Sequence, residues 1–148
     1  MLPRWHILFG GIFSLLIWIV APKTKLIFIL SVFLSSFLID LDHYLSSVFR
    51  TKRLSLFHAF EYHRKIDELE LKKKKQGIRE KGDFHLFHTI EFHILIGILG
   101  LYWIGFFYIF LGIIFHSLID IYSLLYVKEV YRREYFLTNW VWKKIKRS

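Results

Sequence analysis

Residues 84–127 read FHLFHTIEFHILIGILGLYWIGFFYIFLGIIFHSLIDIYSLLYV and are almost continuously apolar. A helix needs about 20 apolar residues to cross the hydrocarbon core of a bilayer, which is about 30 Å thick. This stretch is long enough for two such helices, and its natural break is at Trp103-Ile104-Gly105. We therefore expect a hairpin of two transmembrane helices over residues 86–102 and 105–127.

Two further apolar runs precede this stretch, over residues 5–21 and 26–45, and Pro22-Lys23-Thr24-Lys25 separates them as a helix stop and a turn. Hydrophobic residues make up 55% of the 148-residue chain, which is more than a soluble core of this length requires. The sequence therefore predicts an all-α, polytopic membrane protein with a single domain, residues 1–148. Its four short transmembrane helices form two hairpins.

The remaining segments are basic. Of the 21 Lys and Arg residues, 11 lie in residues 46–83 and 7 follow Val127. Positive residues favour the cytoplasmic side of a membrane, so we expect a multi-pass protein of the cell membrane with both termini and the loop in the cytoplasm. Apolar residues at helical spacing predict an amphipathic helix in the loop, and the aromatic tail, residues 128–148, predicts an interfacial helix. We assign the net charge of +9 to topology and contact with membrane lipids, not to nucleic acid.

Ionisable residues occur inside the expected spans, where they are costly and indicate a functional site. They are His6, Asp40, Asp42, His43, His85, His88, Glu91, His93, His116 and Asp120. Counting about fifteen residues from each expected turn places one residue of every span about 22 Å from the far face. The four residues are His6, Asp40, His88 and Asp120. The sequence therefore predicts one polar layer near the cytoplasmic side.

Helical spacing gives the direction of these side chains, because residues three or four apart share a helix face. The pairs that meet this condition are His116/Asp120, His88/Glu91, His85/His88 and Asp40/His43. Asp42 can join them only if the second helix ends or unwinds near Ile39. His93 lies about 140° from His88 around the helix and is not expected to take part.

The chain has no cysteine, so any metal must be held by imidazole and carboxylate groups. Such ligands suit one or two divalent ions of zinc, manganese or iron. We expect metal ligation by His6, Asp40, Asp42, His85, His88, His116 and Asp120, and catalytic roles for Asp42, His43 and Glu91. The competing interpretation is that these groups pair with each other and only pack the bundle.

Four short motifs resemble the YdjM-type family of membrane-bound metal-dependent hydrolases. They are an early His6, the Asp40-Leu41-Asp42-His43 stretch, His88-Thr89 before an apolar helix, and His116 four residues before Asp120. The resemblance implies metal or catalytic positions at His6, Asp40, Asp42, His43, His88, His116 and Asp120. It does not supply a substrate.

The chain departs from that family pattern twice. Ile39 stands where the family commonly has proline, and Gly82-Asp83-Phe84-His85 replaces a His-Arg-Gly stretch, which leaves open whether His85 substitutes for the missing histidine. In addition, residues 57–63 (FHAFEYH) echo residues 87–93 (FHTIEFH). The loop copy offers His58, Glu61 and His63 as further ligands, although coincidence in a Phe-, Glu- and His-rich chain is the favoured explanation.

Two classes of function fit this pattern. The first is a metal-dependent hydrolase that acts on a lipid-like substrate, plausibly a phosphoester, at the cytoplasmic leaflet. The second is a metal carrier or sensor without hydrolytic activity. Transport requires a polar path across the membrane, and the far half of the spans offers apolar residues such as Leu16 and Phe110. The pattern therefore favours a one-sided site. A purely structural adaptor leaves the clustered carboxylates unexplained, and the oligomeric state stays open.

Overall fold

The computed structural model describes residues 3–146, and this part of the chain is all-α, as the sequence predicts. The helices are α1 (Pro3–Val20), α2 (Leu26–Leu38), α3 (Leu41–Thr51), α4 (Leu56–Lys75), α5 (Ile90–Tyr102), α6 (Ile104–Tyr126) and α7 (Leu137–Ile145). Two short 3₁₀ turns, η1 (Leu86–His88) and η2 (Val130–Arg132), precede α5 and α7.

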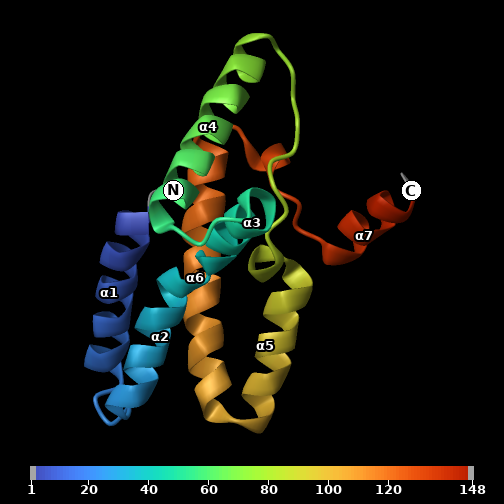
Figure 1. Cartoon of the computed structure of the whole chain (residues 1–148). Helices are drawn as coiled ribbons and strands as arrows, with labels where there is room; N and C mark the ends of the chain where they lie inside the picture. Colours follow the sequence, from blue (N-terminus) through green and yellow to red (C-terminus); the bar gives the residue numbers. More distant parts are fainter. Residues whose placement is uncertain (1–2, 147–148) are drawn as a thin grey trace.

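The helices α1, α2, α5 and α6 lie side by side, and the α1–α2 and α5–α6 turns lie at the same end of this bundle (Figure 1). Helix α6 contacts α1, α2 and α5 and so forms the centre of the bundle. Helix α4 extends beyond the opposite end, where α3 and the loop before α5 also lie (Figure 1). Both helical hairpins expected from the sequence are therefore present, with turns at residues 21–25 and at Trp103, whose backbone is extended.

The expected second span, residues 26–45, is not one straight helix. Helix α2 ends at Leu38, and α3 continues from Leu41 to Thr51 after a bend of 40°. At the bend the Asp40 N–H donates to the carbonyl of Phe37 at 3.2 Å, so the Ser36 carbonyl lacks its usual helical donor. The break that Asp42 needs in order to turn inward is therefore present, although no proline causes it.

The third span also begins later than residue 86. Residues 86–88 form the 3₁₀ turn η1, Thr89 is extended, and α5 starts at Ile90. The Thr89 hydroxyl accepts a hydrogen bond from the Phe92 N–H at 3.3 Å, which caps the new helix. This local signal, a threonine followed by an apolar run, marks the true start of the helix.

Glycines allow α2 to approach both of its neighbours closely. A Cβ at Gly112 in α6 would lie 2.0 Å from the Ser35 hydroxyl and 2.4 Å from the Val32 carbonyl oxygen. A Cβ at Gly10 in α1 would lie 1.9 Å from the Ser36 hydroxyl. Small residues at such contacts are the usual way in which helices pack without a large apolar core between them.

The burial pattern is the reverse of that in a soluble domain. The fully buried large side chains include His6 and His116, whereas leucines and isoleucines on the outside of the bundle are exposed, such as Ile19 (66%) and Leu101 (85%). Among the described residues one helix, α6, can cross a membrane by length and composition, and the bent pair α2–α3 passes the same test when taken together. Helices α1 and α5 are apolar but shorter.

Ion pairs connect α4 to the segment after α6. Lys74 contacts Glu129 at 2.5 Å, Arg132 pairs with Glu70, and the Gly82 N–H donates to the Arg132 carbonyl at 2.8 Å. Glu134 lies between Lys81 (2.9 Å) and Lys143 (2.8 Å). We call these contacts the ion-pair layer. They connect the segment after α6 to α4, to the loop before α5 and to α7.

Candidate metal centre

The polar side chains expected from four spans meet at the end of the bundle away from the hairpin turns. Helix α1 supplies His6, the α2–α3 bend supplies Asp40, Asp42 and His43, the segment before α5 supplies His85 and His88, and α6 supplies His116 and Asp120. Within residues 3–146, the ligand atoms of these side chains form overlapping sets that could hold an ion. We define the inner group as Asp40, His88, His116 and Asp120, and the outer group as Asp42, His43 and His85.

The inner group has the spacing of a metal site. The Nε2 atoms of His88 and His116 are 3.2 Å apart, and each lies 3.5 Å from Asp40 Oδ1. Asp120 Oδ2 is 3.4 Å from the Nε2 of His116 and 3.8 Å from that of His88. Four ligands bound tetrahedrally at about 2.0–2.1 Å would lie about 3.3–3.4 Å from one another. His88, His116 and Asp120 therefore form a set whose ligand atoms all lie within 4.8 Å of one another, and Asp40 Oδ1 lies at ligand spacing from the two Nε2 atoms.

The partners of the Nδ1 atoms determine whether the facing Nε2 atoms carry hydrogen. His88 Nδ1 lies 3.0 Å from Asp42 Oδ2, and His116 Nδ1 lies 2.8 Å from the Ser36 carbonyl oxygen that the helix break leaves free. Both partners are acceptors, so both Nδ1 atoms carry hydrogen. In the neutral rings the two Nε2 atoms then point lone pairs at each other, an arrangement that a shared cation or proton must stabilise. Carboxylate and carbonyl partners of this kind are usual for histidines that bind metal.

His6 and Arg133 approach Asp120 from two sides. His6 Nε2 is 3.1 Å from Asp120 Oδ1, and its ring stacks on that of His116 with centroids 3.9 Å apart. Arg133, in the segment between η2 and α7, contacts Asp120 Oδ2 at 2.7 Å. His6 thus lies next to the inner group, as expected from its distance along the first helix from the turn. Arg133 was not expected there, because in sequence it resembles the other basic residues of the tail.

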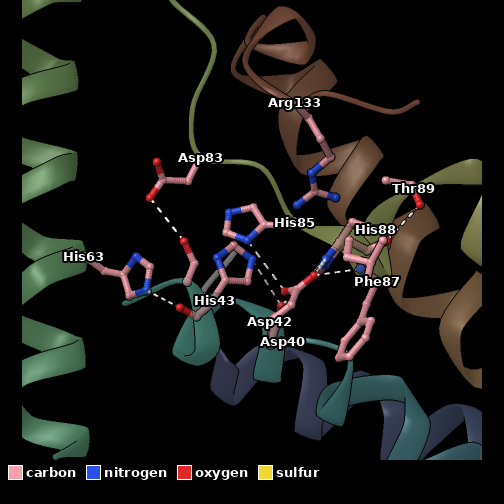
Figure 2. A network of polar contacts seen from close by, with 12 residues as sticks. Asp40, Asp42, His43, His63, Asp83, His85, Phe87, His88, Thr89 and Arg133 are labelled. Atoms are coloured by element: carbon pink, nitrogen blue, oxygen red, sulfur yellow. Dashed lines mark hydrogen bonds and ion pairs between the residues drawn. The ribbon is translucent and has the colours of Figure 1, made fainter. Parts of the chain in front are cut away.

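The outer group lies beside Asp40 and His88 of the inner group (Figure 2). The rings of His43 and His85 have centroids 3.7 Å apart, and His85 Nδ1 is 3.7 Å from Asp42 Oδ1. Asp42 Oδ2 accepts from the Phe87 N–H at 3.0 Å as well as contacting His88, so this oxygen is fully used. His85 therefore lies in a group that could hold an ion, although it comes from a loop and not from a helix, and its role as a ligand stays a prediction.

The structure places Glu91 outside this cluster. Its carboxylate accepts from the N–H groups of Leu137 and Thr138 at 3.0 Å each and from the Thr138 hydroxyl at 2.9 Å. Glu91 therefore caps the first turn of α7, and the helix face shared with His88, on which the expected catalytic role depended, is absent. The reason is that residues 86–89 are not α-helical, so His88 and Glu91 do not share a helix face.

His93 is buried but has its own partners, which agrees with the expectation that it misses the site. Its Nδ1 donates to the Thr89 carbonyl at 2.6 Å, and its Nε2 lies 2.8 Å from the Ser117 hydroxyl. These contacts join α5 to α6. Its role is in packing.

Residues 57–63 (FHAFEYH), which lie in α4, contact the cluster from outside the inner and outer groups. His63 Nε2 donates to the His43 carbonyl at 3.0 Å (Figure 2). Tyr62 donates to Asp83 Oδ2 at 2.8 Å, and Arg50 pairs with Asp83 Oδ1 at 2.7 Å. Burial and then the bond to Asp83 raise the pKa of Tyr62 to about 12. Asp83 thereby holds the loop that carries His85, a role that the sequence did not reveal.

The remaining residues of this copy do not enter the groups within reach of an ion. Glu61 pairs with Lys65 at 2.9 Å, an ordinary i, i+4 contact on α4. His58 is not among the residues that could share an ion with Asp40 or Asp42 in the described part of the chain. Only the third member, His63, reaches the site, and it binds the backbone.

Comparisons of the chain with family models, with curated proteins and with solved structures find no match.

Proposed function

We propose that the chain is a multi-pass membrane protein in which α1, α2, α5 and α6 cross the bilayer, with both termini and α4 in the cytoplasm. The reversed burial pattern supports this, because exposed leucine and isoleucine on the bundle surface are stable in lipid and unfavourable in water. The basic residues at the α4 end of the bundle give the orientation.

Labelling with a membrane-impermeant maleimide tests this topology, because the chain has no cysteine of its own. Ala21→Cys, in the α1–α2 turn, should react in sealed cells. Glu68→Cys, on the exposed side of α4, should react only after the membrane is opened. Reaction of Glu68→Cys in sealed cells would contradict the orientation.

Within this topology we propose a metal-dependent hydrolase that cleaves a lipid-like phosphoester at the cytoplasmic leaflet. The observation that carries the proposal is the pair of facing Nε2 atoms in His88 and His116, flanked by Asp40 and Asp120 at ligand spacing. A divalent ion at this position supplies Lewis-acid polarisation of the ester and lowers the pKa of a water molecule.

The residues around the ligands have separable tasks. Asp42 and the Ser36 carbonyl fix the two imidazole rings, which keeps both Nε2 atoms directed at the centre. The Asp40 side chain is 20% exposed and marks the side from which water and substrate reach the site. These features favour an accessible catalytic site over a closed structural one.

Arg133 is the cation that an anionic substrate would meet. Its side chain is 14% exposed and its guanidinium lies 2.7 Å from Asp120, at the edge of the inner group. A guanidinium binds a phosphoryl group through paired hydrogen bonds. Arg50 pairs with Asp83, which is not among the described residues that could share an ion, whereas the partner of Arg133 is Asp120 of the inner group. We therefore assign substrate-phosphate binding to Arg133.

The test uses the purified protein in phospholipid vesicles. Release of phosphate from an added monoalkyl or diacyl glycerol phosphate should require Zn²⁺ or Mn²⁺, stop with chelator and be lost in Asp40→Asn, while His93→Ala retains it. Metal binding without hydrolysis of these phosphoesters, together with metal-ion uptake by the vesicles, would contradict the hydrolase and support the carrier.

A further inference from the structure

The outer group contains buried polar atoms without a hydrogen-bonding partner. Asp42 Oδ1 and His85 Nδ1 are both inaccessible to solvent and make no hydrogen bond, and the 3.7 Å between them is too long for one. An unsatisfied carboxylate oxygen in an apolar setting is costly. Asp42 as a whole is only 6% exposed, so water does not readily compensate it.

The same atoms have the arrangement of ligands. Two atoms bound to one ion at about 2.1 Å can lie up to about 4.2 Å apart, which includes the observed distance. A ring nitrogen of His43 completes a set of three with Asp42 and His85 in which all ligand atoms lie within 4.8 Å of one another. The rings of His43 and His85, tilted at 36° with centroids 3.7 Å apart, bring two imidazoles close to the Asp42 carboxylate.

Asp40 connects this set to the inner group. Its Oδ1 lies 3.6 Å from His43 Nε2 and 3.5 Å from the Nε2 atoms of both His88 and His116. One carboxylate is therefore within bridging distance of imidazoles from both groups. Two-metal sites that cleave phosphoesters hold their ions about 3.5–4 Å apart, a separation that a bridging carboxylate supports.

The charges of the two groups also indicate a second cation. The two groups together contain three carboxylates, those of Asp40, Asp42 and Asp120, and the ion pairs described for them include one permanent cation, Arg133. The other contacts are to histidines, which are neutral when they bind metal. A single ion in the inner group leaves Asp42 Oδ1 uncompensated.

We propose that Asp42, His43 and His85 bind a second divalent cation, bridged by Asp40 to the ion of the inner group, so that the hydrolytic centre is dinuclear. This inference rests on the metal centre proposed above. His85 then acts as a ligand from the loop that Asp83 holds against α3 and α4.

The experiment measures ions per chain. Purified full-length protein, with any affinity tag removed, is stripped with chelator, dialysed against Zn²⁺ and analysed for metal and protein. We expect two ions per wild-type chain, one in His85→Ala and one in His43→Ala, and two in the control His63→Ala, which loses only a bond to a backbone carbonyl. The ion that remains in the first two variants shows that they are folded.

A second measurement does not depend on a variant. Protein loaded with Mn²⁺ should give the electron paramagnetic resonance spectrum of two exchange-coupled ions. One ion per wild-type chain, an uncoupled spectrum, or two ions retained in both His85→Ala and His43→Ala would overturn the second site while leaving the inner site in place. No bound ion in the wild type would overturn the proposed function as well.

Discussion

The metal centre and the ion-pair layer are the two regions of this molecule where charge is concentrated, and they compensate it differently. In the ion-pair layer the carboxylates have Lys or Arg partners, as Glu129 has Lys74 and Glu134 has Lys81 and Lys143. In the metal centre the carboxylates face mainly imidazoles, whose charge depends on protonation or on a bound ion. The first region is complete as it stands, whereas the second would be completed by the cation that we propose.

The largest expected effect comes from removing a ligand. His116→Ala should lose the ion of the inner group, and Asp40→Ala, which removes the bridging oxygen, should lose both ions and all hydrolysis. Glu129→Gln, a change of similar burial in the ion-pair layer, should keep full metal content.

Elemental analysis on protein that elutes as a folded species separates ligand loss from unfolding in these variants. His93→Ala and His63→Ala serve as histidine controls and should retain their metal. Full occupancy in Asp40→Ala would remove that residue from the site.

Arg133 stands in the chain between Arg132 and Glu134 of the ion-pair layer, and its guanidinium contacts Asp120 of the metal centre. It therefore links these two regions. Arg133→Gln should raise the KM for an anionic phosphoester by roughly 10–100-fold, since a hydrogen bond to a charged group contributes about 1.5–3 kcal/mol. Metal content should not fall, because the variant removes a cation that competes for Asp120.

The matched control for Arg133 is Arg50→Gln, whose partner is Asp83. Its KM should stay near that of the wild type. A larger rise in Arg50→Gln than in Arg133→Gln would show that the phosphate binds on the α3 side of the site.

Close helix packing is what brings the inner group together, and glycine substitutions test it. Gly112→Ala should destabilise the protein by about 1–3 kcal/mol, because the new methyl group overlaps Ser35 and the Val32 backbone. It should also weaken metal binding, since Gly112 lies one turn before His116. Gly11→Ala, whose Cβ would meet Phe33 at an ordinary 3.7 Å, should change neither property in thermal unfolding with and without metal.

The lengths of the apolar runs and the turn residues between them were sufficient to predict both hairpins. The helix rise counted from those turns predicted that five side chains meet, those of His6, Asp40, His88, His116 and Asp120. Hydropathy and helix rise together determine depth, and depth does not depend on exact helix ends. The prediction that His88 and Glu91 share a helix face was wrong, because the direction of a side chain around a helix depends on where that helix begins. The 3₁₀ turn and Thr89 rotate the chain between these two residues.

Contacts made by charged residues outside the expected spans were not predictable from spacing. Arg133 and Asp83 lie in polar segments where a charged residue is ordinary, and nothing in their neighbourhood distinguishes them. The bond from His116 to the Ser36 carbonyl needs the break at Ile39, which the sequence analysis named only as the condition for Asp42 to turn inward.

The smallest expected effect concerns the ion-pair layer alone. Burial tends to raise the pKa of Glu134, but contacts with Lys143, Lys81 and Asn139 outweigh it and lower this pKa from its ordinary 4.5 to about 2. Because the folded pKa is the lower one, this carboxylate stabilises the fold above pH 4.5, and the contribution is lost as the pH falls through about 2. Glu134→Gln should therefore be less stable than the wild type at neutral pH.

Urea unfolding of both proteins across that range measures the difference. The gap should narrow steadily below pH 4.5. A gap that does not change with pH would mean that Glu134 contributes packing and not charge.

X-ray absorption at the zinc edge shows whether His88 and His116 share a cation through their facing Nε2 atoms. The zinc-loaded wild type should show imidazole scattering with nitrogen and oxygen ligands at about 2.0–2.2 Å, and His116→Ala should lose one imidazole contribution. Zinc surrounded by oxygen alone, with the same spectrum in both proteins, would contradict the account.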